Sequence, residues 1–176
     1  MYFLINKTLV IHSLDPKNLI IDENKSEETA SLASMLGLKS HTVQVSDDRR
    51  VRIFLSATSE IHVTENKHYY LTCLSDICPI DYNTMQNSIK RLRPEFLNSY
   101  PTPLCSDALV AASGGSKREI ETNNLELIKA CRYLKENHIP TFISSLDNLK
   151  YVLPYDSQTF TTLLHNNGIS MRYLGL

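Results

Sequence analysis

The sequence lacks an excess of charge of either sign. Its 18 lysines and arginines face 19 aspartates and glutamates, which leaves a formal net charge of −1 over 176 residues. Non-specific wrapping of nucleic acid requires a strong positive field, so the composition excludes that mode of binding. Any contact with RNA must therefore come from local basic patches.

No apolar run in the sequence has the length of a membrane span. The apolar start, Met1 to Ile5, is interrupted by Lys7 and His12, and no basic segment precedes it. We expect no signal peptide and no membrane contact. We also expect the protein to be cytoplasmic and monomeric.

Cysteine is scarce and has no metal-binding spacing. The four cysteines form no C-x-x-C pair, and no His-x-x-x-His accompanies them: Cys73, Cys78, Cys105 and Cys131. We expect no metal site and reduced thiols that pack as small hydrophobes.

A catalytic constellation is also missing. The run Gly114-Gly115-Ser116-Lys117 lacks the first glycine of a phosphate-binding loop, and no nucleophile motif accompanies His165. Aspartates 76, 81 and 107 are scattered in places typical of turns and caps. We expect a protein that is not an enzyme and has no cofactor or small-molecule substrate, with a hydrolase as the weaker alternative.

Hydrophobic residues make up 42% of the chain, enough for a folded core. Strands come first along the sequence and helices follow, which predicts an α+β fold: an N-terminal antiparallel β meander with one helix, then a mostly helical part. The helix should begin near Ser26 and end at Gly37. The expected strands are 2–5 and 8–12 as a hairpin, 19–21, 41–45, 51–55, 61–63 and 69–74.

The second half should hold several helices and one last strand. We expect helices from Asn83 or Thr84 to Leu92, from Pro94, over 106–112, over 118–137, from Pro140, and from Asp156 or Ser157 to Gly168, then a strand over 169–174. The chain should be one domain, 1–176. A sub-domain seam is possible near 100–116, where proline and glycine connectors occur.

Basic residues cluster at three places. For Lys90, Arg91 and Arg93 the alternatives are phosphate contact and simple capping of a helix C-terminus. The run of residues 47–52 contains two aspartates, which favours a solvated turn. Lys117 and Arg118 follow two glycines, so that loop is either a mobile segment that becomes ordered on binding or a solvent-exposed linker.

Four stretches, taken in order, resemble the clustered-mitochondria (CLU) domain. The last contains Gly-Ile-x-x-Arg-Tyr-Leu-Gly, and the resemblance covers about residues 28–176: Glu28 to Val43, His68 to Leu74 with Ile80 to Asn83, Leu92 to Phe96, and Leu164 to Gly175. It implies structural roles for Gly168, Tyr173 and Gly175, and it adds Arg172 to the basic candidates.

The large members of this family resemble ribosome- and mRNA-associated factors that affect mitochondrial distribution. A separate module of this size is also similar to the dormancy factors that microsporidia place on idle ribosomes. That resemblance implies a hibernation factor that contacts rRNA and ribosomal proteins, occupies the tRNA exit (E) site and keeps translation silent. The alternative is a CLU-type adaptor linked to mRNA, translation and mitochondrial distribution.

Overall fold

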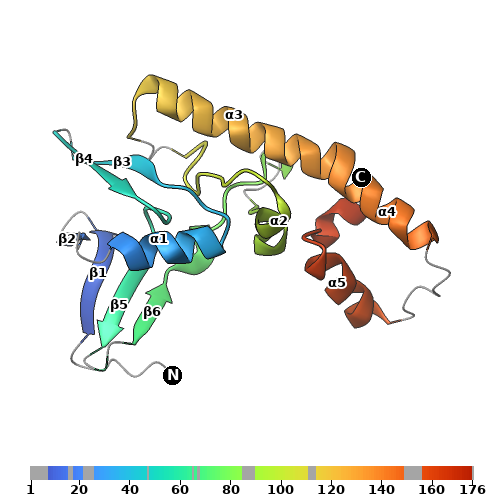
Figure 1. Cartoon of the computed structure of the whole chain (residues 1–176), viewed down its shortest axis with the longest axis horizontal. Coiled ribbons are helices and arrows are strands. Elements are labelled where there is room, and N and C mark those ends of the chain that lie inside the picture. Colours follow the sequence, from blue (N-terminus) through green and yellow to red (C-terminus); the bar gives the residue numbers. More distant parts are fainter. Residues whose placement is uncertain are drawn as a thin grey trace.

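The computed structural model describes residues 8–15, 18–21, 26–46, 48–64, 66, 68–84, 90–110, 114–148 and 156–175. It confirms the α+β class: antiparallel strands and one helix form the N-terminal part, and a mostly helical part follows (Figure 1). The strand expected over 2–5 lies outside the described residues.

One antiparallel sheet contains four strands in the order β2-β1-β5-β6. Its strands are β1 (Thr8–Asp15), β2 (Asn18–Ile21), β5 (Glu60–Thr64) and β6 (Tyr69–Thr72). Helix α1 (Ser26–Met35) crosses in front of this sheet (Figure 1). Gly37 follows α1 with φ +65°, the left-handed conformation predicted for a glycine that ends a helix.

Strands β3 (His41–Ser46) and β4 (Arg49–Ile53) form a separate two-stranded hairpin. The meander expected over 41–74 is therefore divided between two sheets. The cause lies in β1, which occupies the edge of β5 that a continuous meander would give to β4.

The core joins both halves of the chain. The segment from Leu104 to Ala108 is buried, and Leu104 pairs with Leu38 in a parallel bridge. Helix α2 (Pro94–Ser99) inserts Phe96 and Leu97 into the same core. The helix expected over 106–112 is absent from 106–110: these residues form turns, and Leu109 has φ +63°, which no α-helix accommodates. The seam near 100–116 stays a prediction.

One long helical rod lies across the molecule (Figure 1). It consists of α3 (Lys117–Tyr133), the π-helical segment η4 (Leu134–His138) and α4 (Ile139–Asn148). Pro140 was expected to open a separate helix, but it lies in the first turn of α4 without a break. In η4 the Ile139 N–H donates to Leu134 O, five residues back, so the rod widens just before the proline and relieves its clash with the preceding turn.

Helix α5 (Ser157–Asn166) begins at Asp156, whose side chain accepts a hydrogen bond from Thr159 N, as expected for a cap. The tail is not a strand: Met171–Gly175 form the 3-10 helix η5, because Arg172 and Tyr173 both turn inward to one buried carboxylate. Residues Leu74–Asp76 and Tyr82–Thr84 form short 3-10 helices, η2 and η3. Most of the helix expected up to Leu92 falls on residues 85–89, outside the described part.

Candidate functional site

Arg91 and Arg93 are held by carboxylates. Arg91 Nη2 lies 2.5 Å from Asp76 Oδ1, and Nη1 donates to Cys78 O. Arg93 donates two hydrogen bonds to Glu95, at 3.0 and 2.8 Å. Neither residue lies in a described helix: Arg91 forms a bridge with Ile80, and Arg93 is the extended residue before Pro94, which begins α2. The capping interpretation concerns a helix over residues 85–89, which lie outside the described part, and it stays a prediction. Lys90 is exposed.

Arg172 is also committed to an interior contact. Asp81, at 0% exposure, accepts hydrogen bonds from Arg172 Nη2 at 2.6 Å and from the Tyr173 hydroxyl at 2.6 Å. Arg172 Nη2 also donates to Arg91 O. Burial and the neighbouring Asp81 carboxylate raise the pKa of Tyr173, which keeps this hydroxyl a donor. The signature residues thus stabilise the fold, and Arg172 has little freedom to contact a ligand.

Gly168 has φ +72°, as predicted for the glycine that ends α5. A Cβ there would lie 2.5 Å from Phe96 N, so the helix end also packs directly on α2. Gly175 is the last residue of η5.

A second buried pair escaped sequence reasoning. His41 Nε2 lies 2.8 Å from Asp107 Oδ2, and Asp107 also accepts from Ser56 Oγ and Ala57 N. Burial alone lowers the pKa of His41, but hydrogen bonding to Asp107 and Cys105 outweighs it and raises that pKa to about 10. The pair is closed from solvent, which argues for a structural role. An aspartate inside the apolar stretch 104–110 was the one available signal.

Three of the four cysteines pack in the interior as expected, and the expectation is wrong for Cys73. Cys78, Cys105 and Cys131 are buried and Cys73 is exposed. Burial raises the pKa of the Cys131 thiol to about 12, which leaves it unreactive. Within the described ranges, no cluster of three metal-ligating side chains occurs and no helix could cross a membrane.

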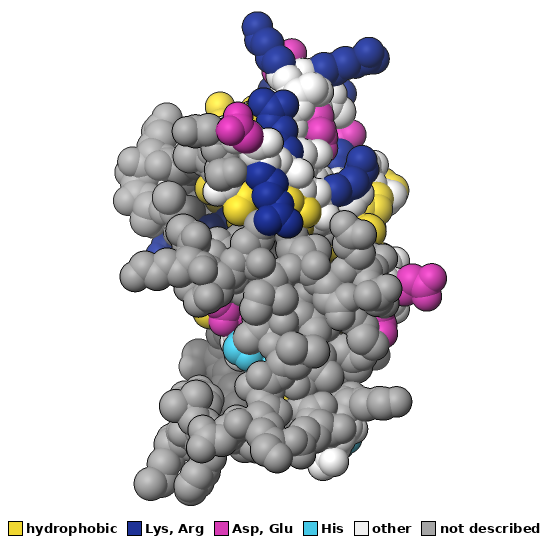
Figure 2. Space-filling view, turned by 90° about the vertical axis from the view of Figure 1, so that its left-hand side faces the viewer, with side chains coloured by type: hydrophobic (Ala, Val, Ile, Leu, Met, Phe, Trp, Pro, Cys, Tyr) yellow, Lys and Arg dark blue, Asp and Glu magenta, His cyan; other side chains and the backbone are white. Residues whose placement is uncertain are grey.

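Five further cations come together from two distant parts of the sequence. We call them the basic surface: Arg49, Arg50 and Arg52 of β4, and Lys117 and Arg118 at the start of α3. Lys and Arg side chains gather at this end of the molecule in Figure 2. Two exposed acids, Asp48 and Glu121, lie next to these cations along the sequence. The Glu121 carboxylate is 4.0 Å from the Lys117 ammonium.

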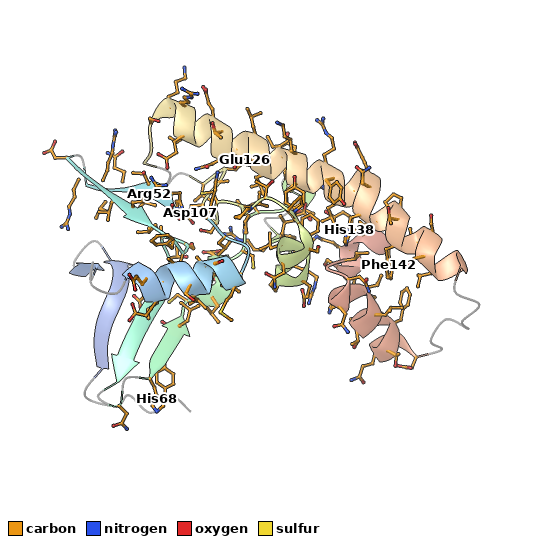
Figure 3. The ribbon with its side chains drawn as sticks, in the orientation of Figure 1. Arg52, His68, Asp107, Glu126, His138 and Phe142 are labelled. Carbon is orange, nitrogen blue, oxygen red and sulfur yellow. The ribbon has the colours of Figure 1, made fainter. Side chains whose placement is uncertain are left out.

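Hydrogen bonds from β3 hold the two parts together. Gly114 N donates to Thr42 O at 3.0 Å, and Thr42 N and Oγ1 donate to the Glu119 carboxylate. Thr42 pairs with Arg52 across the hairpin and Gln44 pairs with Arg50, so both arginines lie on the face that meets the start of α3. Arg52 is labelled at the hairpin in Figure 3.

Gly114 is buried against β3, which corrects the expectation of a solvent-exposed linker at the first residue of this loop, whereas residues 116–118 are exposed. The expectation of a solvated turn at 47–52 is corrected in part, because residues 49–52 belong to a strand. Elsewhere in the part of the chain that the structure describes, Arg49, Arg50 and Arg118 have no carboxylate within ion-pair distance. These cations are open to a ligand.

Comparison with known proteins gives two family matches. Residues 6–83 match the family described as "Clustered mitochondria", and residues 151–176 match "Translation initiation factor eIF3 subunit 135". The resemblance expected over about 28–176 is therefore confirmed only in part. The two matched segments meet in space where Arg172 and Tyr173 contact Asp81.

The curated relatives carry the same name. A clustered mitochondria protein homolog from Candida glabrata is 25% identical over 171 residues, which cover 81% of this chain and 13% of the relative. The clustered mitochondria protein of Arabidopsis thaliana is 39% identical over 62 residues, 35% of this chain and 4% of the relative. The Neurospora crassa homolog is 37% identical over 59 residues, 34% and 5%. The chain thus spans a small part of the length of these relatives.

No solved structure matches the chain. The names of the relatives overturn the expected function as a ribosome dormancy factor in the E site. They favour the adaptor alternative. Residues 6–83 carry a match to the clustered-mitochondria domain, and through them this chain is similar to clustered mitochondria proteins.

Proposed function

We propose that this chain is a non-enzymatic RNA-binding module of the clustered-mitochondria type, acting as an adaptor linked to translation. The observation that carries the proposal is the basic surface, where five cations from two elements are exposed in a chain of net charge −1. The other basic candidates, Arg91, Arg93 and Arg172, are engaged with carboxylates.

Phosphate is the ligand chemistry that fits this surface. Four of its five cations are arginines, whose planar guanidinium donates two parallel hydrogen bonds to a phosphate. Arg50 and Arg52 are two residues apart on one strand, so their side chains leave the same face about 7 Å apart. The start of α3 adds free N–H groups and the positive end of a helix dipole. Such a surface binds a nucleic-acid backbone without reading its sequence.

The names of the matched families support the link to translation. The tail resembles a translation initiation factor subunit, and the relatives are clustered mitochondria proteins. We therefore expect the ligand to be mRNA and the adaptor to connect it with mitochondrial distribution. The ribosome and a cytoplasmic location remain predictions.

Binding of the full chain to a labelled RNA at several salt concentrations tests the proposal. Replacing Arg49 and Arg50 by alanine should weaken binding and reduce the slope of log affinity against log salt by about 0.7 per lost contact on single strands. Lys90→Ala is the matched control, because Lys90 is exposed but lies outside the basic surface. An unchanged salt slope in the double variant, or an equal loss in the control, would refute the site.

A second measurement tests the adaptor role. Tagged chain in a cell extract should sediment with mRNA and shift to the top of the gradient after nuclease treatment. Sedimentation that ignores nuclease would contradict an mRNA-dependent adaptor.

A further inference from the structure

The solvent-facing side of α3 continues the basic surface along the helix. Arg118, Leu125, Lys129 and Arg132 follow one another at spacings of seven, four and three residues, so they lie on one face. All four are exposed, and the opposite face is buried in the core. Leu125 is 57% exposed, a large apolar side chain between cations. The face runs about 21 Å from Arg118 to Arg132.

Two of the three acids of α3 are engaged away from these cations. Glu119 accepts hydrogen bonds from Thr42, and Glu126 forms an ion pair with Lys39, on the side of the helix that faces the rest of the molecule (Figure 3). Within the residues that the structure covers, Arg118, Lys129 and Arg132 have no ion-pair partner. Glu121 alone remains, near Lys117. Glu121 lies on the outer face between Arg118 and Leu125, so the face is positive at its two ends, at Arg118 and at Lys129 with Arg132.

An aromatic side chain borders the far end of this face, four residues after Lys129 and on the side of the helix toward Tyr100. Tyr133 is 42% exposed and directly follows Arg132. Its ring centroid lies 5.5 Å from that of Tyr100, which in turn lies 5.5 Å from the buried ring of Phe96. Tyr133 packs on the Tyr100 ring and the His138 ring lies 6.4 Å away, so the exposed part of the Tyr133 ring can receive a flat ligand at a small cost in side-chain entropy.

We propose that a single RNA strand lies along the outer face of α3, with its phosphates on Arg118, Lys129 and Arg132 and one base stacked on Tyr133. This inference rests on the proposed function and adds the substrate class. Stacking on an aromatic side chain requires an unpaired base, since a duplex hides its base faces. The combination of cations with an exposed ring is typical of single-strand binding.

The test compares two probes on the full chain, a labelled 12-nucleotide polyuridine and a labelled RNA duplex. The parent should prefer polyuridine. Tyr133→Ala should weaken polyuridine binding by about five-fold or more and leave duplex binding unchanged, while Tyr133→Phe keeps the ring and the affinity. Tyr70→Ala is the matched control, because Tyr70 is an exposed tyrosine on β6. Should Tyr133→Ala unfold the protein, Tyr133→Leu retains apolar packing and still removes the ring.

The outcomes separate the two proposals. Polyuridine binding that depends on Arg49 and Arg50 but ignores the loss of the Tyr133 ring would overturn the strand path and leave the basic surface intact. Equal affinity of the parent for duplex and polyuridine would also overturn the stacking site. A parent that binds neither probe would refute the proposed function itself.

Discussion

At the scale of single residues, three aspartates pair with basic side chains, and two of them, Asp81 and Asp107, lie in the interior. Asp76 binds Arg91, Asp81 binds Arg172, and Asp107 binds His41. A buried carboxylate is costly unless it is paired and hydrogen-bonded, so the pairs of Asp81 and Asp107 fix where their segments meet. The sequence presents these aspartates as ordinary turn residues, because their partners are 15, 91 and 66 positions away.

Gly168 yields the first prediction. Gly168→Ala should lower the free energy of unfolding by about 1 kcal/mol or more, because a side chain at φ +72° is strained and its Cβ would meet the backbone of Phe96. Urea unfolding measures the loss. Gly115→Ala is the control, since a Cβ there first meets the end of the flexible Glu119 side chain. Equal unfolding midpoints for the two variants would contradict a special role for Gly168.

The His41–Asp107 pair yields a pH prediction. The pKa of His41 is raised from 6.5 to about 10, so its contribution to stability is complete below pH 6.5 and is lost as the pH rises toward 10. The free energy of unfolding, measured by urea titration between pH 6 and 10, should therefore fall more steeply with pH for the parent than for His41→Gln. The difference in slope should reach up to about 1.4 kcal/mol per pH unit. Parallel pH profiles would rule out a protonated His41.

At the scale of elements, local sequence signals predicted where most strands and helices lie along the chain, but not which elements pair with one another. Alternation located β3 to β6, and capping residues located the ends of α1 and α5. Which strands pair could not be predicted, because β1 joins β5 across more than forty residues. The rod α3–η4–α4 was missed because Pro140 is a strong local break signal, and the π-helical turn that relieves it has no sequence signature of its own.

The same limit applied to the candidate site. Lys117 and Arg118 were recognised, but their neighbours on β4 became visible only once Thr42 had been found to bind Glu119. Arg91, Arg93 and Arg172 looked equally basic in the sequence. Arg91 and Arg172 meet their carboxylate partners only in the tertiary fold, and Arg93 meets Glu95 because of the chain geometry around Pro94. The sequence alone therefore does not distinguish these paired cations from unpaired ones.

The cap of α3 yields a prediction at this scale. Ser116 Oγ accepts a hydrogen bond from Glu119 N, so Ser116→Ala should reduce the free energy of unfolding by about 1 kcal/mol. Ser116→Asp should restore it, because an anionic cap also favours the helix dipole. Thermal unfolding compares the two variants. An alanine variant as stable as the parent would show that packing of Gly114 on β3 alone fixes this end of the rod.

At the scale of the whole molecule, the segment from Leu104 to Ala108 lies inside the common core and contacts both halves of the chain. We therefore expect one cooperative unfolding transition. Helix content followed at 222 nm and hydrogen exchange of β5 and β6 should report the same urea midpoint. Two separated midpoints would instead support a division at the seam near 100–116.

The contact of Asp81 with Arg172 and Tyr173 also limits how this module can be recombined with its longer relatives. A chimera that takes the tail from one protein and the strand-rich half from another must inherit the acid and its two donors together. Exchanging only one side would leave an unpaired charge in the interior. For domain grafting, residues 81, 172 and 173 form a single transferable unit, although about ninety positions of sequence separate the first from the other two.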